Sequence, residues 1–326
     1  MSLPVVSVII VNWNGAQYLP TCLSALIQQT YTPLEIVIVD NASTDDSCQV
    51  IEMFQHRHQE LRALTLIKNT CNAGFCRGNN QGIQRAHGEF ILLLNADVTL
   101  TPDFIAHLVH LMSSDPMIGI TLGKLVSGDD QTIFDSTGIV ILKNRRALDR
   151  GQYEKDHGQY DVREEVFGAS GAACLYRKTM LEQIAFSEQE YLDEVFFAYK
   201  EDVDLAWRAR LAGWTCVYTP EAVGTHFRAW GTGKRADIPK WVRRHSLKNR
   251  YLMLLKNECW LTLAPALGSI AWYEIRSLFY ILIWEPYLLS VIGTIVRSWP
   301  EIMKKRRKTQ QIATEKTKRD LCQWFH

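Results

Sequence analysis

Carboxylate, amide and imidazole side chains stand at a few positions of this sequence where they could bind a ligand or exchange a proton. The positions are Asp40, Asn95 with Asp97, the adjacent pair Glu201 and Asp202, and His226. Taken singly, an acidic residue of this kind is typical of a helix cap or a turn. Their use in chemistry therefore depends on the elements that bring them together.

The first hundred residues alternate between strand and helix patterns. Short, apolar, β-branched runs typical of strands buried on both faces of a sheet occur at residues 5–11, 34–39, 64–67 and 89–94. Apolar residues at helical spacing separate them at residues 18–29, 46–58 and 78–86. This alternation predicts an α/β fold with a doubly wound, mostly parallel, Rossmann-like sheet that is flanked by helices.

Polar side chains follow three of the predicted strands. Asn12, Asp40 and Asp97 each stand just after an apolar run. In open α/β sheets, ligands bind beyond the carboxyl ends of the strands. We therefore expect these three residues to share one ligand site.

The pattern beyond residue 100 is less regular. Residues 128–165 are polar and charged, and we interpret them as loops for an acceptor or for regulation, with a hairpin expected around Ile139–Arg145. A helix over 201–211, which Gly213 ends, leads into a strand over 214–218.

Composition indicates a folded protein in a reducing compartment. Apolar residues make up 47% and charged residues 22%, which excludes disorder and disulfide-scaffold classes. The eight cysteines form no CxxC pair, so we interpret them as reduced thiols. The first residues lack the basic stretch of a signal peptide, and we expect a cytoplasmic location.

The joint order of these motifs resembles glycosyltransferase family 2 over roughly residues 5–230. The nucleotide-binding strand ends of that family are similar to residues 8–14 and 37–45, and its donor-side Gly-Phe and Asn-rich loop is similar to residues 72–82. Its acceptor-side helix is similar to residues 201–214. The resemblance implies a GT-A fold and inverting transfer of a sugar from a nucleotide diphosphate. Within the family, the pattern is most similar to rhamnosyltransferase-type enzymes of bacterial surface polysaccharide synthesis.

The resemblance implies a metal-assisted reaction. Departure of a nucleoside diphosphate needs positive charge, normally from Mg²⁺ or Mn²⁺ on oxygen ligands, and Asp97 is the expected ligand. Family members commonly have Asp-x-Asp where this chain has Asn95-Ala96-Asp97, so metal affinity should be low without the donor diphosphate. His226 matches the position of a further ligand in some members, and imidazole favours Mn²⁺. A histidine that is only hydrogen-bonded at a strand end is the alternative.

The resemblance also implies a general base. Inversion requires a carboxylate that takes the proton of the acceptor hydroxyl, and the matching residue is Asp202. Glu201 is the close alternative, because adjacent carboxylates raise each other's pKa while the helix dipole opposes that shift. An acidic first turn of an ordinary helix is the structural alternative for both residues.

Donor recognition is expected at the strand ends and in the loop that follows them. Asp40 and Asn12 can accept the imide N–H shared by uracil and thymine, which favours a UDP or dTDP donor over GDP. Asp45 and Arg77 could contact the ribose or the diphosphate. The complete predicted donor set is Asn12, Asp40, Asp45, Arg77, Asn80 and Asn95.

The sequence also bears on three other functions. The chain has no GxGxxG after its first strand and no GxxxxGK[ST], which argues against a nicotinamide-binding fold and excludes a P-loop NTPase. A catalytically inactive nucleotide- or carbohydrate-binding protein on the same fold is the remaining alternative. Asn95 supports that alternative, whereas Glu201, Asp202 and His226 argue against it.

The C-terminal part has a different character. Residues 277–296 are apolar apart from Glu285, which Pro286 follows, and a central Glu-Pro is unusual in a membrane span. We expect two shorter helices in the membrane interface, with aromatic side chains at headgroup depth and the basic run 304–308 drawn to anionic lipid. A helical hairpin packed on the catalytic domain, or a dimer interface, is the alternative. Binding of nucleic acid is not expected, because the aromatic residues lie in an apolar run without interleaved Lys or Arg.

The predicted organisation has two parts. Residues 1–235 form a GT-A catalytic domain, and residues 236–326 form a helical, aromatic-rich and basic region that associates with a membrane. The expected partners are a dTDP- or UDP-sugar, a glycan or lipid-linked acceptor and a membrane surface. The protein is expected at the inner face of the cell membrane, as a peripheral protein.

Overall fold

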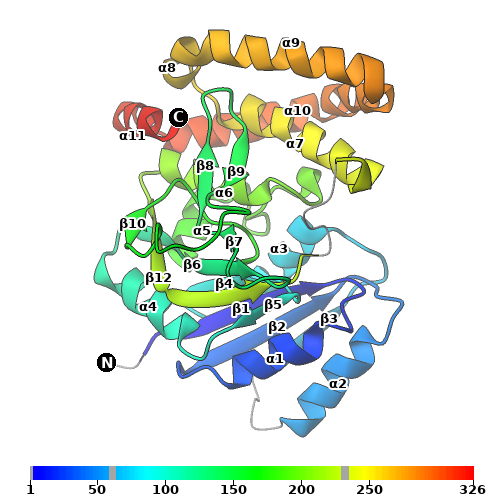
Figure 1. Ribbon diagram of the computed structural model, residues 1–326, viewed down its shortest axis with the longest axis vertical. Helices are drawn as coiled ribbons and strands as arrows, with labels where there is room; N and C mark the ends of the chain where they lie inside the picture. Colours follow the sequence, from blue (N-terminus) through cyan, green and yellow to red (C-terminus); the bar gives the residue numbers. More distant parts are fainter. Residues whose placement is uncertain (1–2, 59–63, 229–234) are drawn as a thin grey trace.

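A ten-stranded sheet forms the centre of the computed structural model, which describes residues 3–58, 64–228 and 235–326 (Figure 1). Its strands are β1 (Val6–Asn12), β2 (Leu34–Asp40), β3 (Leu64–Lys68), β4 (Phe90–Leu94), β5 (Val98–Leu100), β6 (Ile118–Ser127), β7 (Phe134–Ser136), β10 (Glu164–Glu165), β11 (Ala173–Arg177) and β12 (Thr215–His226). They lie in the order β10-β12-β6-β11-β4-β1-β2-β3, with β5 beside β12 and β7 beside β6. A separate hairpin joins β8 (Ile139–Ile141) to β9 (Ala147–Asp149).

The α/β architecture with a central sheet and flanking helices is confirmed, but the sheet is mixed. Strands β3, β2, β1 and β4 are parallel, and β1 pairs with β2 in a register that sets Asn12 opposite Asp40. Strand β11 then runs antiparallel between β4 and β6. Beyond β11, β6 and β12 again pair in parallel, so β11 is an antiparallel strand within an otherwise parallel order. Strands β5, β7 and β10 add antiparallel pairs with β6 or β12.

Helices cover both faces of this sheet. They are α1 (Leu19–Ile27), α2 (Ser47–Arg57), α3 (Phe75–Arg85), α4 (Phe104–Ser114), α5 (Lys178–Ile184) and α6 (Glu201–Leu211). Buried side chains of α1, α2 and α4 share one core with alternate residues of the central strands, and those of α3, α5 and α6 share the other. In β4, for example, Leu92 belongs to the first core and Leu93 to the second, as the two-residue period of a strand requires.

The C-terminal helices extend the second core. They are α7 (Lys240–Asn257), α8 (Trp260–Leu263), α9 (Leu267–Trp284), α10 (Ser290–Ile312) and α11 (Glu315–Asp320). Leu252 and Met253 of α7 and Ile302 of α10 are buried among the side chains of α5 and α6. Helix α9 lies outside this layer, at the end of the molecule that is farthest from α1 and α2 (Figure 1).

The expected interruption at Glu285 and Pro286 is present, because α9 ends at Trp284 and α10 begins at Ser290. Glu285 is buried and forms ion pairs with Arg235 and Arg243. In the described part of the chain, one helical stretch, Trp260–Trp284, is long and apolar enough to cross a membrane, by length and composition alone.

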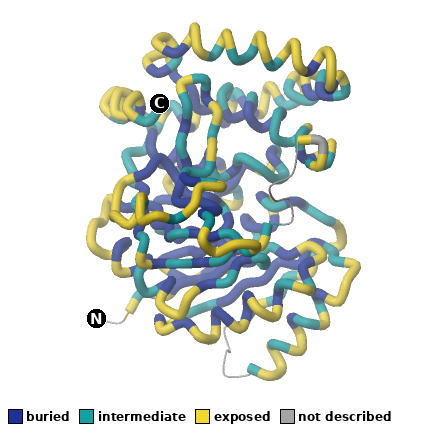
Figure 2. Tube along the Cα trace, viewed as in Figure 1, coloured by how far each residue is buried: buried dark blue, intermediate teal, exposed yellow. Residues whose placement is uncertain are grey.

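The two C-terminal helices differ in exposure. Almost all of α9 is exposed or half-buried, including Trp272 and Phe279 at 63% each (Figure 2). In the basic run 304–308, Lys304, Arg307 and Lys308 are exposed and Arg306 is half-buried, so the expectation that the run faces outward is wrong for Lys305 alone. Lys305 is buried, and Arg306 and Lys308 donate hydrogen bonds to main-chain carbonyls, because α10 packs this side against α7 and the loop that follows α5.

Candidate active site

Asp97 and His226 come together at the carboxyl side of the sheet. Asp97 follows β4 in the turn to β5, and His226 ends β12, which pairs with β5. The Nε2 atom of His226 lies 3.4 Å from Oδ1 of Asp97. The two side chains thus face each other from separate segments that only the sheet makes neighbours.

A second carboxylate holds the other side of the imidazole. Asp135 of β7 lies 2.8 Å from Nδ1 of His226, and it also pairs with Arg228. Burial lowers the pKa of His226, but the two carboxylates outweigh burial and raise it to about 9. The side chain of Arg228 continues to Asp149 at the end of β9, at 2.9 Å.

Glu201 and Asp202 begin helix α6. Oδ2 of Asp202 accepts a hydrogen bond from the main-chain N–H of Gly171 at 3.1 Å, and Oδ1 accepts one from Val203 at 2.7 Å. Oε2 of Glu201 is buried without a hydrogen-bond partner. Burial and then the charge of Asp202 raise the pKa of Glu201 to about 8. Burial and then Asp149 raise the pKa of Asp202 as well.

The segment before α6 has an unusual backbone. Phe197, Tyr199 and Lys200 all have positive φ angles, between 67° and 73°, a conformation that costs energy for residues other than glycine. Asn249 of α7 holds the segment in place. Its amide nitrogen lies 2.7–3.0 Å from the carbonyl oxygens of Phe196, Ala198 and Tyr199. A C-terminal helix therefore fixes the turn that places Glu201 and Asp202.

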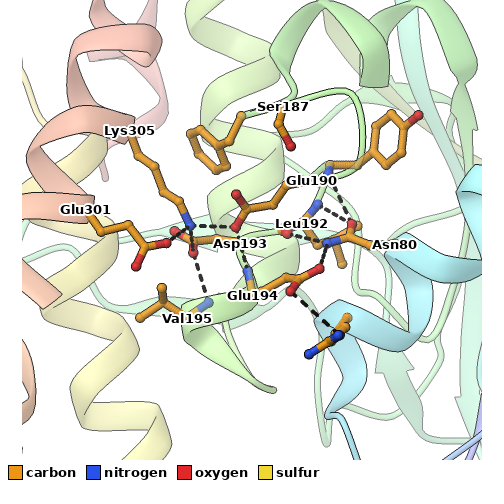
Figure 3. Close-up of polar contacts among 12 residues, drawn as sticks. Asn80, Ser187, Glu190, Leu192, Asp193, Glu194, Val195, Glu301 and Lys305 are labelled. Atoms are coloured by element: carbon orange, nitrogen blue, oxygen red, sulfur yellow. Dashed lines mark hydrogen bonds and ion pairs between the residues drawn. The ribbon is translucent and has the colours of Figure 1, made fainter. Parts of the chain in front are cut away.

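Buried ion pairs tie α6 to the C-terminal helices. Lys256 of α7 is fully buried and pairs with Asp193 and Asp204, the latter at 2.9 Å. Lys305 of α10 pairs with Asp193 at 2.6 Å and with Glu190 at 2.5 Å (Figure 3). Burial opposes ionisation of Asp193, but the two lysines dominate and lower its pKa. Asp204 therefore has a structural role two residues after Asp202.

One cavity of about 610 Å³ collects the predicted catalytic and metal-binding residues. We call it the catalytic cavity. Its walls include Asn95, Asp97, Glu201, Asp202 and His226. The volume is within the range of about 300–1,000 Å³ that is usual for small-molecule sites.

The predicted base-recognition residues form a separate network at the ends of β1 and β2. Nδ2 of Asn12 donates to Oδ1 of Asp40 at 2.9 Å, and Ser43 donates to the same carboxylate through Oγ and its main-chain N–H. Oδ1 of Asn12 is buried without a partner, so an acceptor remains free there. A Cβ placed on Gly15 would lie 3.6 Å from Cβ of Ala96, so this network adjoins the Asn95–Asp97 turn.

The remaining donor residues have different surroundings. Asp45 accepts hydrogen bonds from the main-chain N–H groups of Ala16 and Ser47, which joins the two strand-end loops. Arg77 is 61% exposed, and its Nε is 4.0 Å from Glu194.

Asn80 does not line the catalytic cavity, and the donor contact predicted for it is not supported. Its Oδ1 accepts from the N–H groups of Tyr191 and Leu192, and its Nδ2 donates to Leu192 O and to Glu194 (Figure 3). Because the side chain is 1% exposed and both ends of its amide are engaged, Asn80 orders the loop before α6.

The side chains in the catalytic cavity fit a divalent cation that takes some of its ligands from the protein and the others from a diphosphate. In the described residues, no group of three or more His, Cys, Asp or Glu side chains is placed to hold a metal. Neighbouring ligands of an octahedral site lie about 3 Å apart, close to the separation of Asp97 Oδ1 and His226 Nε2. A carboxylate on the second nitrogen, as Asp135 supplies, is usual for a metal-binding histidine. Of the described residues, Asp97 and His226 are thus the pair that could hold such a cation.

Several residues of this site were not identified from the sequence. Asp135, Asp149, Lys200 and Arg228 line the cavity or hold its walls, and none stands in a recognisable motif. For Asp135 and Asp149, the sequence indicated only that they lie in residues 128–165, which we interpreted as functional loops.

Comparisons with known proteins agree with this geometry. The sequence profile described as Glycosyl transferase family 2 matches residues 7–185. The N-acetylglucosaminyl-diphospho-decaprenol L-rhamnosyltransferase of Mycobacterium tuberculosis is 26% identical over 276 residues, 77% of this chain and 84% of that protein. Two solved structures resemble the fold, each with a TM-score of 0.57.

The first of these structures is the mannosyltransferase PcManGT from Pyrobaculum calidifontis with GDP-Man and Mn²⁺, which is 18% identical and matches 99% of this chain and 84% of its own. The second is S. aureus TarS 1–349 in complex with UDP, which is 17% identical and matches 97% of this chain and 91% of its own. Both have the central sheet and helices described above.

Proposed function

The chain belongs to glycosyl transferase family 2 and is a glycosyltransferase, and we propose that it moves a sugar from a dTDP- or UDP-sugar to a glycan or lipid-linked acceptor with inversion at the anomeric carbon. The observation that carries this proposal is the catalytic cavity, where Asp202 lies with Asp97 and His226. The name of the mycobacterial relative supports rhamnose as the sugar and a lipid-linked acceptor.

The acceptor hydroxyl would be deprotonated by Asp202. In a direct displacement, the hydroxyl oxygen attacks the anomeric carbon, its proton passes to the carboxylate, and the bond to the nucleoside diphosphate breaks. The pKa of about 8 for Glu201 favours Asp202 as the base, because Glu201 then keeps its proton at neutral pH. The main-chain N–H of Gly171 would hold Asp202 in position.

Asp97 and His226 would hold a divalent cation against the donor diphosphate. When bound, the cation supplies positive charge against the oxygen atoms of the leaving diphosphate. Mn²⁺ is the better match to an imidazole ligand than Mg²⁺. Asp135 would keep the His226 ring in the orientation that turns Nε2 toward Asp97.

Asn12 and Asp40 would recognise the base of the nucleotide. The free Oδ1 of Asn12 can accept the imide N–H of uracil or thymine, whereas guanine presents a different donor pattern. Asp45 bridges the two loops that would enclose the ribose. This arrangement supports a UDP or dTDP donor.

The protein would work as a peripheral protein at the cytoplasmic face of a membrane. Helix α9 carries the exposed apolar side chains, among them Trp272, Phe279 and Trp284, at 63–65% exposure. Such aromatic residues settle at headgroup depth, and an amphipathic helix binds by burying its apolar face. Replacing all three by Gln should abolish binding to phosphatidylcholine vesicles without changing thermal stability, and vesicle binding equal to wild type would contradict this role.

Thermal stabilisation by nucleotides tests the donor site. We expect dTDP or UDP with Mn²⁺ to stabilise the protein by about 2.7 kcal/mol, relative to the protein without ligand, at a hundredfold excess over Kd. GDP should stabilise it less. Asp97→Asn should remove the dependence on Mn²⁺, whereas Asp129→Asn, at an exposed site, should keep it. The absence of stabilisation by any of the nucleotides would contradict the proposed donor site and favour an inactive binding protein.

A further inference from the structure

A basic cavity of about 900 Å³ lies between helix α7, helix α9 and the turn of the β8–β9 hairpin. Among the described residues, its walls carry six cationic side chains and no carboxylate. They are Arg146, Lys200, Arg235, Arg243, Arg250 and Arg276. Such an imbalance is characteristic of a site for a multiply charged anion.

The positive charge of the basic cavity is only partly neutralised from behind. Glu285 pairs with both Arg235 and Arg243, and Glu274 pairs with Arg250 at 2.7 Å. Two carboxylates therefore form ion pairs with three of the six cations.

Two of the other cations are free to bind a ligand. Arg146, in the hairpin turn, and Arg276, on α9, are exposed, and within the described residues neither side chain has a hydrogen-bond or ion-pair partner. Arginine binds phosphate oxygens through two parallel N–H donors, so two free guanidinium groups, one from the hairpin turn and one from α9, suit a diphosphate.

The basic cavity adjoins the catalytic cavity. Six residues line both cavities, and Lys200, directly before Glu201, is one of them. The others are Ala147, Leu148, Ile238, Val242 and Ser246. A chemical group attached to an anion held between α7 and α9 would therefore reach into the catalytic cavity, where Asp202 lies.

On its other side, the basic cavity adjoins an apolar groove of about 350 Å³ between α7, α9 and α10. Leu247, Ile281 and Leu288 line both spaces. All the residues that line the apolar groove are apolar or aromatic. The exposed apolar side of α9 continues this surface outward.

Resting on the proposed function, we infer that the basic cavity binds the diphosphate of a lipid-linked acceptor, with the acceptor sugar in the catalytic cavity and the alkyl chain in the apolar groove. The order catalytic cavity, basic cavity, apolar groove matches the order sugar, diphosphate, hydrocarbon in such a molecule. A nucleotide or free diphosphate would leave the apolar groove unused. Arg146 and Arg276 are the specificity-determining residues of this site.

The test measures binding of the full chain to three kinds of vesicle. All three consist of phosphatidylcholine. The first also contains a small fraction of a polyprenyl diphosphate, the second contains phosphatidylglycerol at the same total charge, and the third contains neither. We expect the strongest binding to the polyprenyl diphosphate vesicles, with inorganic pyrophosphate as a competitor. The double variant Arg146→Ala, Arg276→Ala should weaken that binding by about tenfold or more, since two charge-assisted contacts are lost.

A matched variant controls for general charge. Arg57→Ala with Arg85→Ala removes the same charge from exposed positions on α2 and α3 and should bind like wild type. Equal binding to phosphatidylglycerol and polyprenyl diphosphate vesicles, or equal losses in the two double variants, would overturn the inference in favour of unspecific attraction. Binding of pyrophosphate alone, with no preference among vesicles, would overturn the lipid assignment.

Nucleotide stabilisation separates this inference from the proposed function. Arg146→Ala with Arg276→Ala should leave the thermal shift caused by dTDP or UDP with Mn²⁺ unchanged. If nucleotides stabilise the protein but the diphosphate lipid gives no preference, only the present inference fails. If no nucleotide stabilises the wild type, the proposed function fails, whatever the vesicles show.

Discussion

The two carboxylates that begin helix α6 have different environments although they are adjacent. Glu201 has one buried oxygen without a partner, whereas both oxygens of Asp202 accept main-chain hydrogen bonds. Main-chain donors favour the ionised form of Asp202, whereas burial and the charge of Asp202 favour the protonated form of Glu201. The pair therefore offers one base and one neutral acid at the same place.

Asp202→Asn should abolish transfer and leave nucleotide binding intact. The amide can still accept the hydrogen bond from Gly171, so the fold is kept, but it cannot take a proton. Loss of a general base typically lowers kcat by about 10²–10⁴-fold. Steady-state transfer assays and nucleotide thermal shifts measure the two effects, with Asp129→Asn as the control. Wild-type activity in the Asp202 variant would remove this mechanism.

Glu201 should make the stability of the protein depend on pH. The folded state keeps the Glu201 proton up to about pH 8, whereas the unfolded chain releases it near 4.5. Between these values the folded state binds more protons, so the free energy of unfolding falls as pH rises. Glu201→Gln should remove that slope. The free energy of unfolding of the variant should therefore exceed that of the wild type by the largest amount at pH 8. Parallel urea unfolding curves at pH 5.5 and 8 measure it, and an unchanged slope in the variant would contradict the raised pKa.

At the scale of elements, α6 is positioned by two helices that come after it in the chain. Lys256 of α7 pairs with Asp204, and Asn249 of α7 holds the strained turn before Glu201. Lys305 of α10 fixes the 190–195 loop through Asp193 (Figure 3). The catalytic helix and its supports therefore act as one packed layer.

Lys256→Met should destabilise the protein by about 3–5 kcal/mol, because it leaves Asp193 and Asp204 buried with fewer partners. Urea denaturation would measure the loss as a lower midpoint at an unchanged slope. Lys304→Met removes a lysine from an exposed site on α10 and should change stability by less than about 0.5 kcal/mol. Equal midpoints for the two variants would mean that the buried network contributes nothing measurable.

At the scale of the molecule, the C-terminal region contributes both structure and surface. Residues of α7 and α10 complete one of the two cores, while α9 stays mostly exposed (Figure 2). We propose that the regions before and after residue 235 fold as one unit, with α9 as the part that contacts lipid.

A chain that ends at residue 235 should therefore fail to fold to a native state. It would expose the core side chains that cover Leu252 and Ile302, and Asp193 would lose both lysines. Proton NMR dispersion and a thermal unfolding transition would show this, with the full chain carrying the three α9 Gln substitutions as a folded control. A cooperative transition in the shortened chain would show instead that the catalytic part folds alone.

Much of the architecture could be predicted from local patterns. The strand–helix alternation predicted β1 to β4, and Glu285 with Pro286 predicted the interruption between α9 and α10. A family resemblance grouped Asp97, His226, Glu201 and Asp202 in one site, and the structure places all four around one cavity. The donor contact predicted for Asn80 is not supported, because the sequence of an Asn-rich loop does not indicate whether its amides face the ligand or the protein interior.

The sequence by itself determined the elements and the reactive residues, because periodicity and motif order are local properties of the chain. Only the tertiary structure decided which distant side chains meet. The partnership of Asp135 with His226 joins residues 91 positions apart, and that of Lys305 with Asp193 joins residues 112 positions apart. The same holds for the basic cavity, whose arginines come from the β8–β9 turn, a short helix at residues 235–237, α7 and α9. Charge becomes a binding site only when packing brings it to one place with too few carboxylates to neutralise it, and no local pattern records that.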